Sequence, residues 1–381
     1  MDPLLGTCAL PELRQRTSVK WREYAGDVLP SFVAEMDFDL AEPVVRVVTD
    51  ALRRSDCGYA HKGRLGEAYA SFAATRFGWA PDPDLIYPIP DVMTGLAEVV
   101  GAITEPGAGI VVSVPVYPPF LFRFGFYGRK IIEAPLARDA SGRYDLDPAA
   151  VEAAVSDPAA QVYVLCSPHN PTGNVWTRDQ LTMVADICQA HGVTVLADEI
   201  HAPLVLAGSR FVPFGSLDHE AAARSFTFTS ATKGWNIPGL KCGLIVAGGR
   251  DSVGMIEQRW EAFLAAHLGI LASVAAFTEG LPWLDAVLAQ LDQNRMLLAR
   301  LLAQQLPAVR YAPPRASFLA WLDCRELGLG DNPAEAFLAK GKLAVGAGPD
   351  FGQAGRGHVR LNMGTSPELL TEAVRRMAAT R

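Results

Sequence analysis

Two short apolar runs in the middle of the chain, joined by a helical pattern, constrain the fold more than any other feature of the sequence. Val162–Cys166 and Val193–Ala197 are continuously apolar, and Arg178–His191 between them has helical periodicity that Gly192 ends. A strand, a helix and a strand in this order predict a βαβ unit of a parallel sheet. Because neither run alternates with polar residues, we expect both faces of this sheet to be covered by helices.

Further apolar runs predict additional strands of the same sheet, at Gly109–Val114, Ser225–Thr229 and Gly243–Ala247. Ligands of such a sheet gather at the carboxyl ends of its strands. The sequence therefore predicts an α/β protein whose site lies where these runs end.

The pattern changes near residue 284. A long helix is predicted over Leu284–Leu306, followed by short strands around Ser317–Leu322 and His358–Leu361, with one helix between them and one at the end. We expect three parts: an N-terminal segment, 1–43, a large domain, 44–283, and a smaller α+β domain, 284–381, which the N-terminal segment joins in space.

Charge and composition exclude several classes of function. The 381 residues are 50% hydrophobic, and 34 basic against 41 acidic residues give a net charge of −7 without basic runs, so neither nucleic acid nor an anionic membrane surface is an expected partner. Met1–Leu13 lacks the basic start and apolar run of a secretory signal, and we expect a cytoplasmic protein. The six cysteines form no CxxC pair or metal-ligand cluster, so reduced thiols and no metal are expected.

Polar residues follow two of the predicted strands. Asp198 comes directly after Val193–Ala197, and the turn Ser167–Gly173, which presents Asn170, comes after Val162–Cys166. An aspartate there can hold the proton on the ring nitrogen of pyridoxal 5′-phosphate (PLP), and an amide can donate to its phenolate oxygen. Each residue alone also fits an ordinary turn, but their places on neighbouring strands favour a shared site.

Lys233 lies just beyond the run Ser225–Thr229, in a tight loop rich in Ser and Gly. A lysine in this position can form an imine with PLP and then move a proton at the α-carbon of an amino acid. That chemistry needs the amine pKa to fall from about 10.4, through burial and neighbouring positive charge.

Donors for a phosphate group are predicted nearby. Asp91 can cap a helix that starts after it, which leaves the amides of Val92 and Met93 free to bind an anion. Ser230 and Lys241 can add a hydroxyl group and a positive charge. Tyr117, after the run Gly109–Val114, can stack on the pyridine ring, although an aromatic residue beside prolines commonly serves packing.

These motifs, in this order, resemble the fold-type-I PLP enzymes of the aspartate aminotransferase superfamily, and within it the cystathionine β-lyase group of MalY/PatB type. The resemblance extends over nearly the whole chain and rests on the segments Ser18–Trp21, Phe32–Phe38, Gly58–Tyr59, Pro90–Gly95, Cys166–Gly173, Asp198–His201, the Lys233 loop and Val359–Gly364. It implies a large domain with a mixed, mostly parallel sheet between helices, and a smaller α+β domain formed by the N- and C-terminal segments.

The resemblance also implies roles for individual residues. Lys233 would carry the cofactor, Asp198 would hold the ring nitrogen, and His201, in the Asp-Glu-Ile-His motif of the lyase group, would be a further cofactor contact. Arg360 would bind the substrate α-carboxylate with its two-pronged guanidinium group, next to Asn170 and Tyr117. Tyr59 would reach the cofactor phosphate of a second subunit, which makes the expected partner another copy of the chain.

The implied reaction is β-elimination from a cysteine S-conjugate such as cystathionine. An aminotransferase needs the same residues, and a protein that uses the fold for regulation is a third alternative. Thr232 stands where the lyase group usually has Ser, Gly234 stands where a larger residue is frequent, and the stretch after Gly364 begins with Thr365, not Cys. These departures leave open an enzyme of specialised metabolism that acts on a bulky S-conjugate, by elimination or by decarboxylation coupled to deamination.

Overall fold

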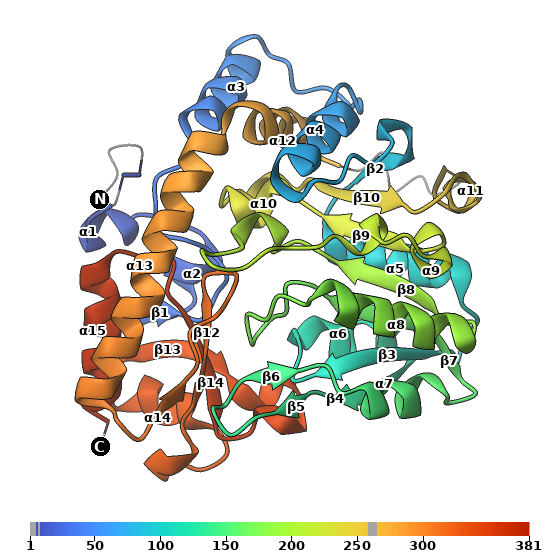
Figure 1. Cartoon of the computed structure of the whole chain (residues 1–381). Helices are drawn as coiled ribbons and strands as arrows, with labels where there is room; N and C mark the ends of the chain where they lie inside the picture. The colour runs from blue at the N-terminus through green and yellow to red at the C-terminus, as the bar shows by residue number, and fades with distance from the viewer. Residues whose placement is uncertain (1–4, 7, 258–264, 381) are drawn as a thin grey trace.

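The computed structural model describes residues 5–6, 8–257 and 265–380. Two sheets dominate it, one of seven strands and one of five, with helices around both (Figure 1). The α/β fold class predicted from the sequence is therefore confirmed.

The seven-stranded sheet has the order β2-β10-β9-β8-β7-β3-β4. Its strands are β2 (Ile86–Ile89), β10 (Gly243–Ala247), β9 (Phe226–Thr229), β8 (Thr194–Asp198), β7 (Ala160–Cys166), β3 (Gly109–Val114) and β4 (Lys130–Pro135). All pairs from β9 to β4 are parallel, whereas β10 runs antiparallel to both of its neighbours. The sheet is thus mixed and mostly parallel, as predicted.

Alternate side chains of the strands pack against different helices. Ile110 and Val112 of β3 pack with α5 (Val92–Ile103) and α6 (Pro118–Phe122). Val111 between them packs with α7 (Pro148–Val155) and α8 (Arg178–Ala190) on the other face. This burial on both sides is the physical reason why the strand runs are continuously apolar.

The five-stranded sheet combines the two ends of the chain. Its order is β1-β13-β14-β12-β11, with β1 (Leu29–Ser31), β13 (Leu343–Ala347), β14 (His358–Asn362), β12 (Leu319–Asp323) and β11 (Arg310–Tyr311). β1 pairs in parallel with β13, more than 300 residues later. The remaining helices of this part are α1 (Leu10–Leu13), α2 (Val19–Arg22), α13 (Leu281–Gln305), α14 (Pro333–Ala339) and α15 (Pro367–Ala378). The predicted division of the chain into three parts, 1–43, 44–283 and 284–381, stays a prediction.

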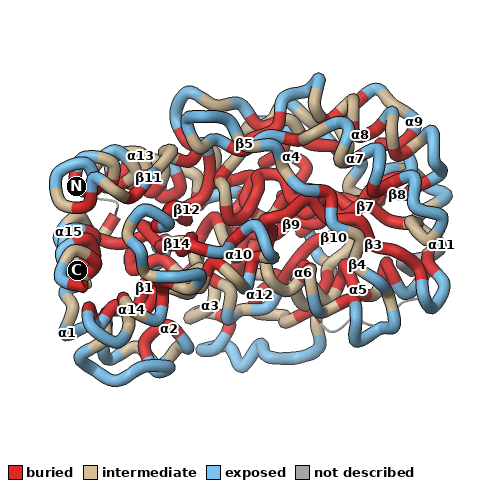
Figure 2. Tube along the Cα trace, turned by 90° about the horizontal axis from the view of Figure 1, so that it is seen from below, coloured by how far each residue is buried: buried red, intermediate tan, exposed pale blue. Residues whose placement is uncertain are grey.

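One hydrophobic core connects the two sheets. It contains Phe38 from the N-terminal segment, Phe72 of α4 (Leu65–Phe77), Phe277 of α12 (His267–Glu279) and Leu361 of β14. Figure 2 shows the buried chain running through the middle of the molecule, with the exposed residues at its rim. Among the described residues no single helix is both long and apolar enough to span a membrane, although the pair α12 and α13, bent by 78°, meets that test together.

Candidate active site

Lys233 lies in the short helix α10 (Ala231–Gly234), which follows β9 after one residue. Its Nζ donates a hydrogen bond to the carbonyl oxygen of Ala34 at 2.9 Å. Burial, and next the positive charge of Arg360, lower the pKa of the Lys233 amine to about 8. An appreciable fraction of the amine is therefore neutral near physiological pH, as a base or nucleophile requires.

Asp198 is the last residue of β8, one residue later than the predicted end of that strand. It pairs in register with Cys166 of β7 on one side and Phe228 of β9 on the other, at the carboxyl end of the sheet. Its Oδ1 accepts a hydrogen bond from the Ile200 amide at 3.1 Å. Burial raises the pKa of this carboxyl group to about 7, so a cationic N–H group placed against it would keep it ionised.

Arg360 of β14 is a buried cation that has no acidic partner within ion-pair distance among the described residues. Its two terminal nitrogens donate to Asn170 Oδ1 at 3.2 Å and to the Phe32 carbonyl oxygen at 2.9 Å, and the guanidinium lies 5.0 Å over the Phe351 ring. Its Nε is buried without a partner, and burial lowers the pKa of the group to about 10. A buried guanidinium in this state is suited to an anionic ligand.

His201 and Tyr117 border the same region. Burial, together with the charges of Lys233 and Arg360, lowers the pKa of His201 to about 3, so its ring is neutral. Its Nδ1 is buried without a hydrogen-bond partner. Tyr117 precedes α6, and burial raises the pKa of its hydroxyl group, which feels the charges of Arg360 and Asp198. The structure thus brings together the predicted residues at the ends of four strands, β3, β7, β8 and β9.

The predicted phosphate donors also lie near one another. Asp91 caps α5 by accepting the Thr94 amide at 2.9 Å, so the Val92 and Met93 amides open the helix and have no acceptor within it. Lys241 Nζ lies 3.0 Å from Asp91 Oδ2. The Ser230 hydroxyl donates to the Cys242 carbonyl oxygen at 2.6 Å, so it would have to turn to reach a phosphate group.

Tyr59 is fully exposed in the single chain, on the loop that follows α3 (Glu42–Arg53). It therefore makes no contribution to the site of its own chain in this structure. Of the two departures beside Lys233, Gly234 has a steric reason: a β-carbon there would lie 3.0 Å from Pro203 Cβ. Thr232 Oγ1 lies 2.8 Å from Ser230 Oγ, so its hydroxyl group is held within the loop.

The N-terminal segment 32–37 lies against both Lys233 and Arg360, in the stretch near which the resemblance leads us to expect the pocket for the substrate side chain. Its carbonyl oxygens accept hydrogen bonds from side chains of β14, of two helices and of the loop after α10: from Arg360 to Phe32, from Asn362 to Val33 and Glu35, from Lys233 to Ala34, from Lys20 to Glu35 and from Asn236 to Met36. The buried ion pair of Lys20 with Asp37, at 2.7 Å, fixes its end. Because these hydrogen bonds join the backbone of the segment to side chains far away in the sequence, they leave no periodic pattern in its residues. Only the resemblance to a known family therefore indicated this segment.

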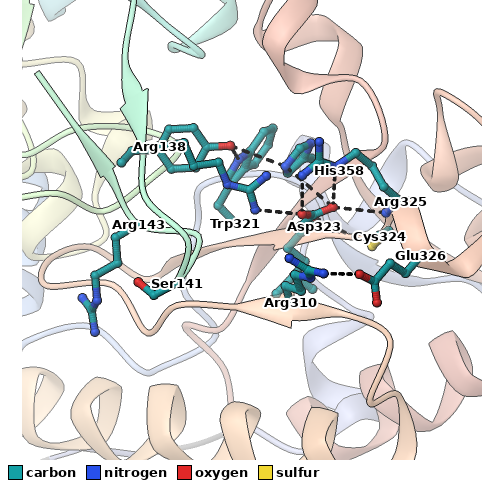
Figure 3. Close-up of polar contacts among 12 residues, drawn as sticks. Arg138, Ser141, Arg143, Arg310, Trp321, Asp323, Cys324, Arg325, Glu326 and His358 are labelled. Atoms are coloured by element: carbon teal, nitrogen blue, oxygen red, sulfur yellow. Dashed lines mark hydrogen bonds and ion pairs between the residues drawn. The ribbon is translucent and has the colours of Figure 1, made fainter. Parts of the chain in front are cut away.

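A cavity of about 410 Å³ lies elsewhere, between the hairpin of β5 (Ala137–Arg138) and β6 (Tyr144–Asp145) and the small sheet. None of the predicted site residues lines it. At its wall the Asp323 carboxylate binds Arg138 at 2.7 Å and Arg325 at 2.8 Å, close to His358 (Figure 3). The carboxylate thus pairs with an arginine from each part of the chain, so we interpret the cluster as a connection between the two parts.

The match to a protein family agrees with this geometry. The model of the family "Aminotransferase class I and II" matches residues 58–377, which include every residue placed above except those of the N-terminal segment. The chain belongs to the aminotransferase class I and II family.

Individual members of this family resemble the chain along nearly its whole length. Cystathionine beta-lyase PatB of Bacillus subtilis is 35% identical, with 95% of this chain and 96% of PatB covered. A cystathionine beta-lyase of Corynebacterium glutamicum is 33% identical, with 97% and 98% covered. The crystal structure of the PLP-bound C-S lyase of Staphylococcus hominis superposes with a TM-score of 0.89 at 25% identity, over 96% of this chain and 95% of that one.

Proposed function

We propose that this chain is a PLP-dependent carbon–sulfur lyase that cleaves cysteine S-conjugates, cystathionine among them, to a thiol, pyruvate and ammonia. The observation that carries the proposal is the convergence of Lys233, a partly buried amine with a lowered pKa, Asp198, a buried carboxylate, and Arg360, a buried guanidinium with no acidic partner among the described residues. The end-to-end similarity to proteins named cystathionine beta-lyase supports elimination over transamination.

The residues present fit PLP. When bound, PLP withdraws electrons from the α-carbon of an amino acid and so weakens the bonds at that carbon. The buried Asp198 carboxylate would hold the ring nitrogen in its protonated form, and the Asn170 amide would donate to the ring oxygen. The first amides of α5, at Val92 and Met93, would bind the phosphate group with help from Lys241 and Ser230.

Two basic side chains would divide the work on the substrate. Arg360 would bind the α-carboxylate through its fork of N–H groups, and so fix the α-carbon next to the Lys233 amine. Lys233 Nζ, with its lowered pKa, would take the proton from that carbon. The Cβ–S bond then breaks, the thiolate leaves, and the released enamine hydrolyses to pyruvate and ammonia.

His201 and Tyr117 would frame the cofactor. The lowered pKa of His201 keeps its ring neutral beside two cations, so one ring nitrogen can accept a hydrogen bond while the other donates one. Its unpartnered Nδ1 gives this residue a free position for a cofactor atom. Tyr117 would stack its ring on the pyridine ring and touch the substrate on the same side.

Incubation with L-cystathionine and PLP alone tests the proposed reaction. We expect pyruvate to form over many turnovers per active site, measured with lactate dehydrogenase, without any added keto acid. A stall after one turnover, with the cofactor in its amine form and activity restored by a keto acid, would establish an aminotransferase in its place.

We also propose that two copies of the chain act together. Full exposure of Tyr59 supports a role outside its own chain, and Val45 and Leu52 of the same region are large apolar side chains that are about half exposed. Light scattering should give a dimer mass. Tyr59→Phe should weaken PLP retention on dialysis without changing that mass, because only a hydrogen bond to the phosphate group of the neighbouring copy would be lost.

A further inference from the structure

An aromatic ring lies against the buried Arg360 cation. The guanidinium carbon is over the face of the Phe351 ring, 5.0 Å from the ring centroid, and the Nε of Arg360 has no hydrogen-bond partner. The negative face of a ring attracts a cation, and the attraction is strongest where water is excluded. An acidic side chain in the same place would also stabilise the charge, but its oxygens would occupy the N–H donors that a substrate carboxylate needs. A ring has no lone pairs that compete for them.

Both large parts of the fold hold the Phe351 ring in place. Phe351 is buried at the end of the 3-10 helix η8 (Gly348–Phe351). Its ring packs against Trp321 with centroids 5.1 Å apart and planes at 60°, and Trp321 of β12 is the register partner of Arg360 in β14. Its carbonyl oxygen accepts a hydrogen bond from the Val116 amide at 3.1 Å, in the loop after β3. The small sheet and the end of the large sheet therefore both determine where the ring lies.

The neighbouring strand on the other side gives Arg360 no side chain to rest on. Its register partner in β13 is Gly346. A β-carbon at Gly346 would lie 3.3 Å from the Arg360 β-carbon and 3.6 Å from its unpaired Nε, so a larger residue there would crowd the guanidinium. The orientation of Arg360 therefore depends on its two hydrogen bonds, to Asn170 and to the Phe32 carbonyl oxygen, and on the Phe351 ring.

We propose that Phe351 is the positioning residue of the carboxylate site, because its ring holds the Arg360 guanidinium in the orientation that binds an α-carboxylate and leaves its N–H donors to that ligand. This inference rests on the proposed function for the role of Arg360 and adds the residue on which the strength of that site depends. Phe351 acts through Arg360, whereas Lys233 removes the α-proton. Loss of the attraction between ring and cation should therefore weaken substrate binding and leave the proton transfer nearly unchanged.

Fluorination of the ring separates its charge distribution from its shape. Phenylalanines that carry one, two or three ring fluorines are incorporated at position 351 by nonsense suppression, and steady-state pyruvate release from cystathionine is measured. Each fluorine withdraws electrons from the face of the ring, so KM should rise with every added fluorine while kcat stays within about twofold. Phe351→Leu removes the ring and should raise KM by about tenfold, which corresponds to about 1.4 kcal/mol.

Phe337→Leu is the matched control. Phe337 of α14 is fully buried in the core, and in the described part of the chain no cation lies over its ring. This variant should lower Tm and keep both kinetic constants, so a change in KM that is specific to Phe351→Leu does not come from a loosened core. The fluorinated variants retain the shape of the ring and test the inference even if Phe351→Leu fails to fold.

A KM that does not depend on the number of fluorines would overturn the inference, since the ring would then act by its shape alone.

Failure of the proposed function gives a different result. If cystathionine yields no pyruvate, the lyase proposal fails, and the carboxylate site is then tested by binding. L-alanine and ethylamine differ only in the α-carboxylate, and the dissociation constants of both are measured from the absorbance change of the bound cofactor. A preference for L-alanine that falls with each added fluorine supports the role of Phe351. The same preference in all variants, or none in the wild type, refutes it.

Discussion

Arg360→Lys is the substitution that most directly tests the proposed carboxylate site, because it keeps the charge and removes the fork. The guanidinium holds Asn170 and the Phe32 carbonyl oxygen and rests on the Phe351 ring, so its position is fixed before any ligand arrives. A lysine ammonium group can replace one of two charge-assisted hydrogen bonds to a carboxylate. The lost bond is worth about 1.5–3 kcal/mol, which corresponds to a roughly 10- to 150-fold fall in kcat/KM.

Most of this loss should appear in KM, because the carboxylate is bound equally before and during proton transfer. The assay is steady-state pyruvate release from cystathionine by wild type, Arg360→Lys and the control Arg356→Lys, whose exposed side chain pairs with Asp331 at 3.3 Å. The control should keep both constants. If Arg360→Lys leaves KM unchanged, Arg360 does not bind the carboxylate and the proposed orientation of the substrate is wrong.

Three further predictions follow from other contacts. Asp198→Asn should still bind PLP but lower kcat by about 10²–10³, because a neutral amide cannot stabilise the protonated ring nitrogen, and a normal rate in stopped-flow assays would contradict this. Burial alone would raise the pKa of Asp323. Hydrogen bonds from Arg325 and Arg138 outweigh burial and hold that pKa well below its usual range. Asp323 therefore stabilises the fold above about pH 4, and this contribution is lost as the pH falls further. Asp323→Asn should therefore lower Tm at pH 7, and the gap to wild type should narrow toward pH 3; a constant gap would contradict the assignment. Trp235→Ala removes a fully buried ring that packs against Phe72 and Phe277 and whose Nε1 donates to the Gly280 carbonyl oxygen at 2.9 Å. It should lower the free energy of unfolding, measured by urea denaturation, by about 3–5 kcal/mol. A decrease of less than about 1 kcal/mol would contradict the packing argument.

The sequence predicts the central part of the fold because burial on both faces leaves an unambiguous pattern. β3 and β10 have the predicted bounds. β8 is shifted by one residue from the predicted Val193–Ala197, to Thr194–Asp198. Other strands were missed where local composition is ambiguous. β1 has three residues with Pro30 in the middle, and β2 contains Pro88, so neither resembles a strand until its partner is known.

The candidate site divides in the same way. Asp198 and Lys233 follow strands, and the rule that ligands bind at strand ends locates them from the sequence. Arg360 is different, since it lies inside a strand and the resemblance alone gave it a role. Within the described part of the chain Arg360 has no acidic partner, and this depends on how β14 packs beside the Asn170 loop. The contact of the Phe351 ring with Arg360 depends likewise on where a short 3-10 helix packs.

Burial of charge is the property that connects these residues. Folding places Lys233, Asp198 and Arg360 in surroundings that move each pKa toward neutrality, and so disfavours all three charges. Such a site lowers the stability of the fold unless ligands supply partners for the charges. The reason is that a buried charge loses its hydration energy and, without a partner, gains no electrostatic attraction in exchange. A ring nitrogen against Asp198 and a carboxylate against Arg360 would compensate two of these charges. Binding energy would then come from supplying partners to these charges, which predicts that Tm rises with PLP and rises again with a substrate analogue that carries an α-carboxylate. An analogue without that carboxylate should give no second rise, and if both analogues stabilise equally, compensation of Arg360 is not the source of the binding energy.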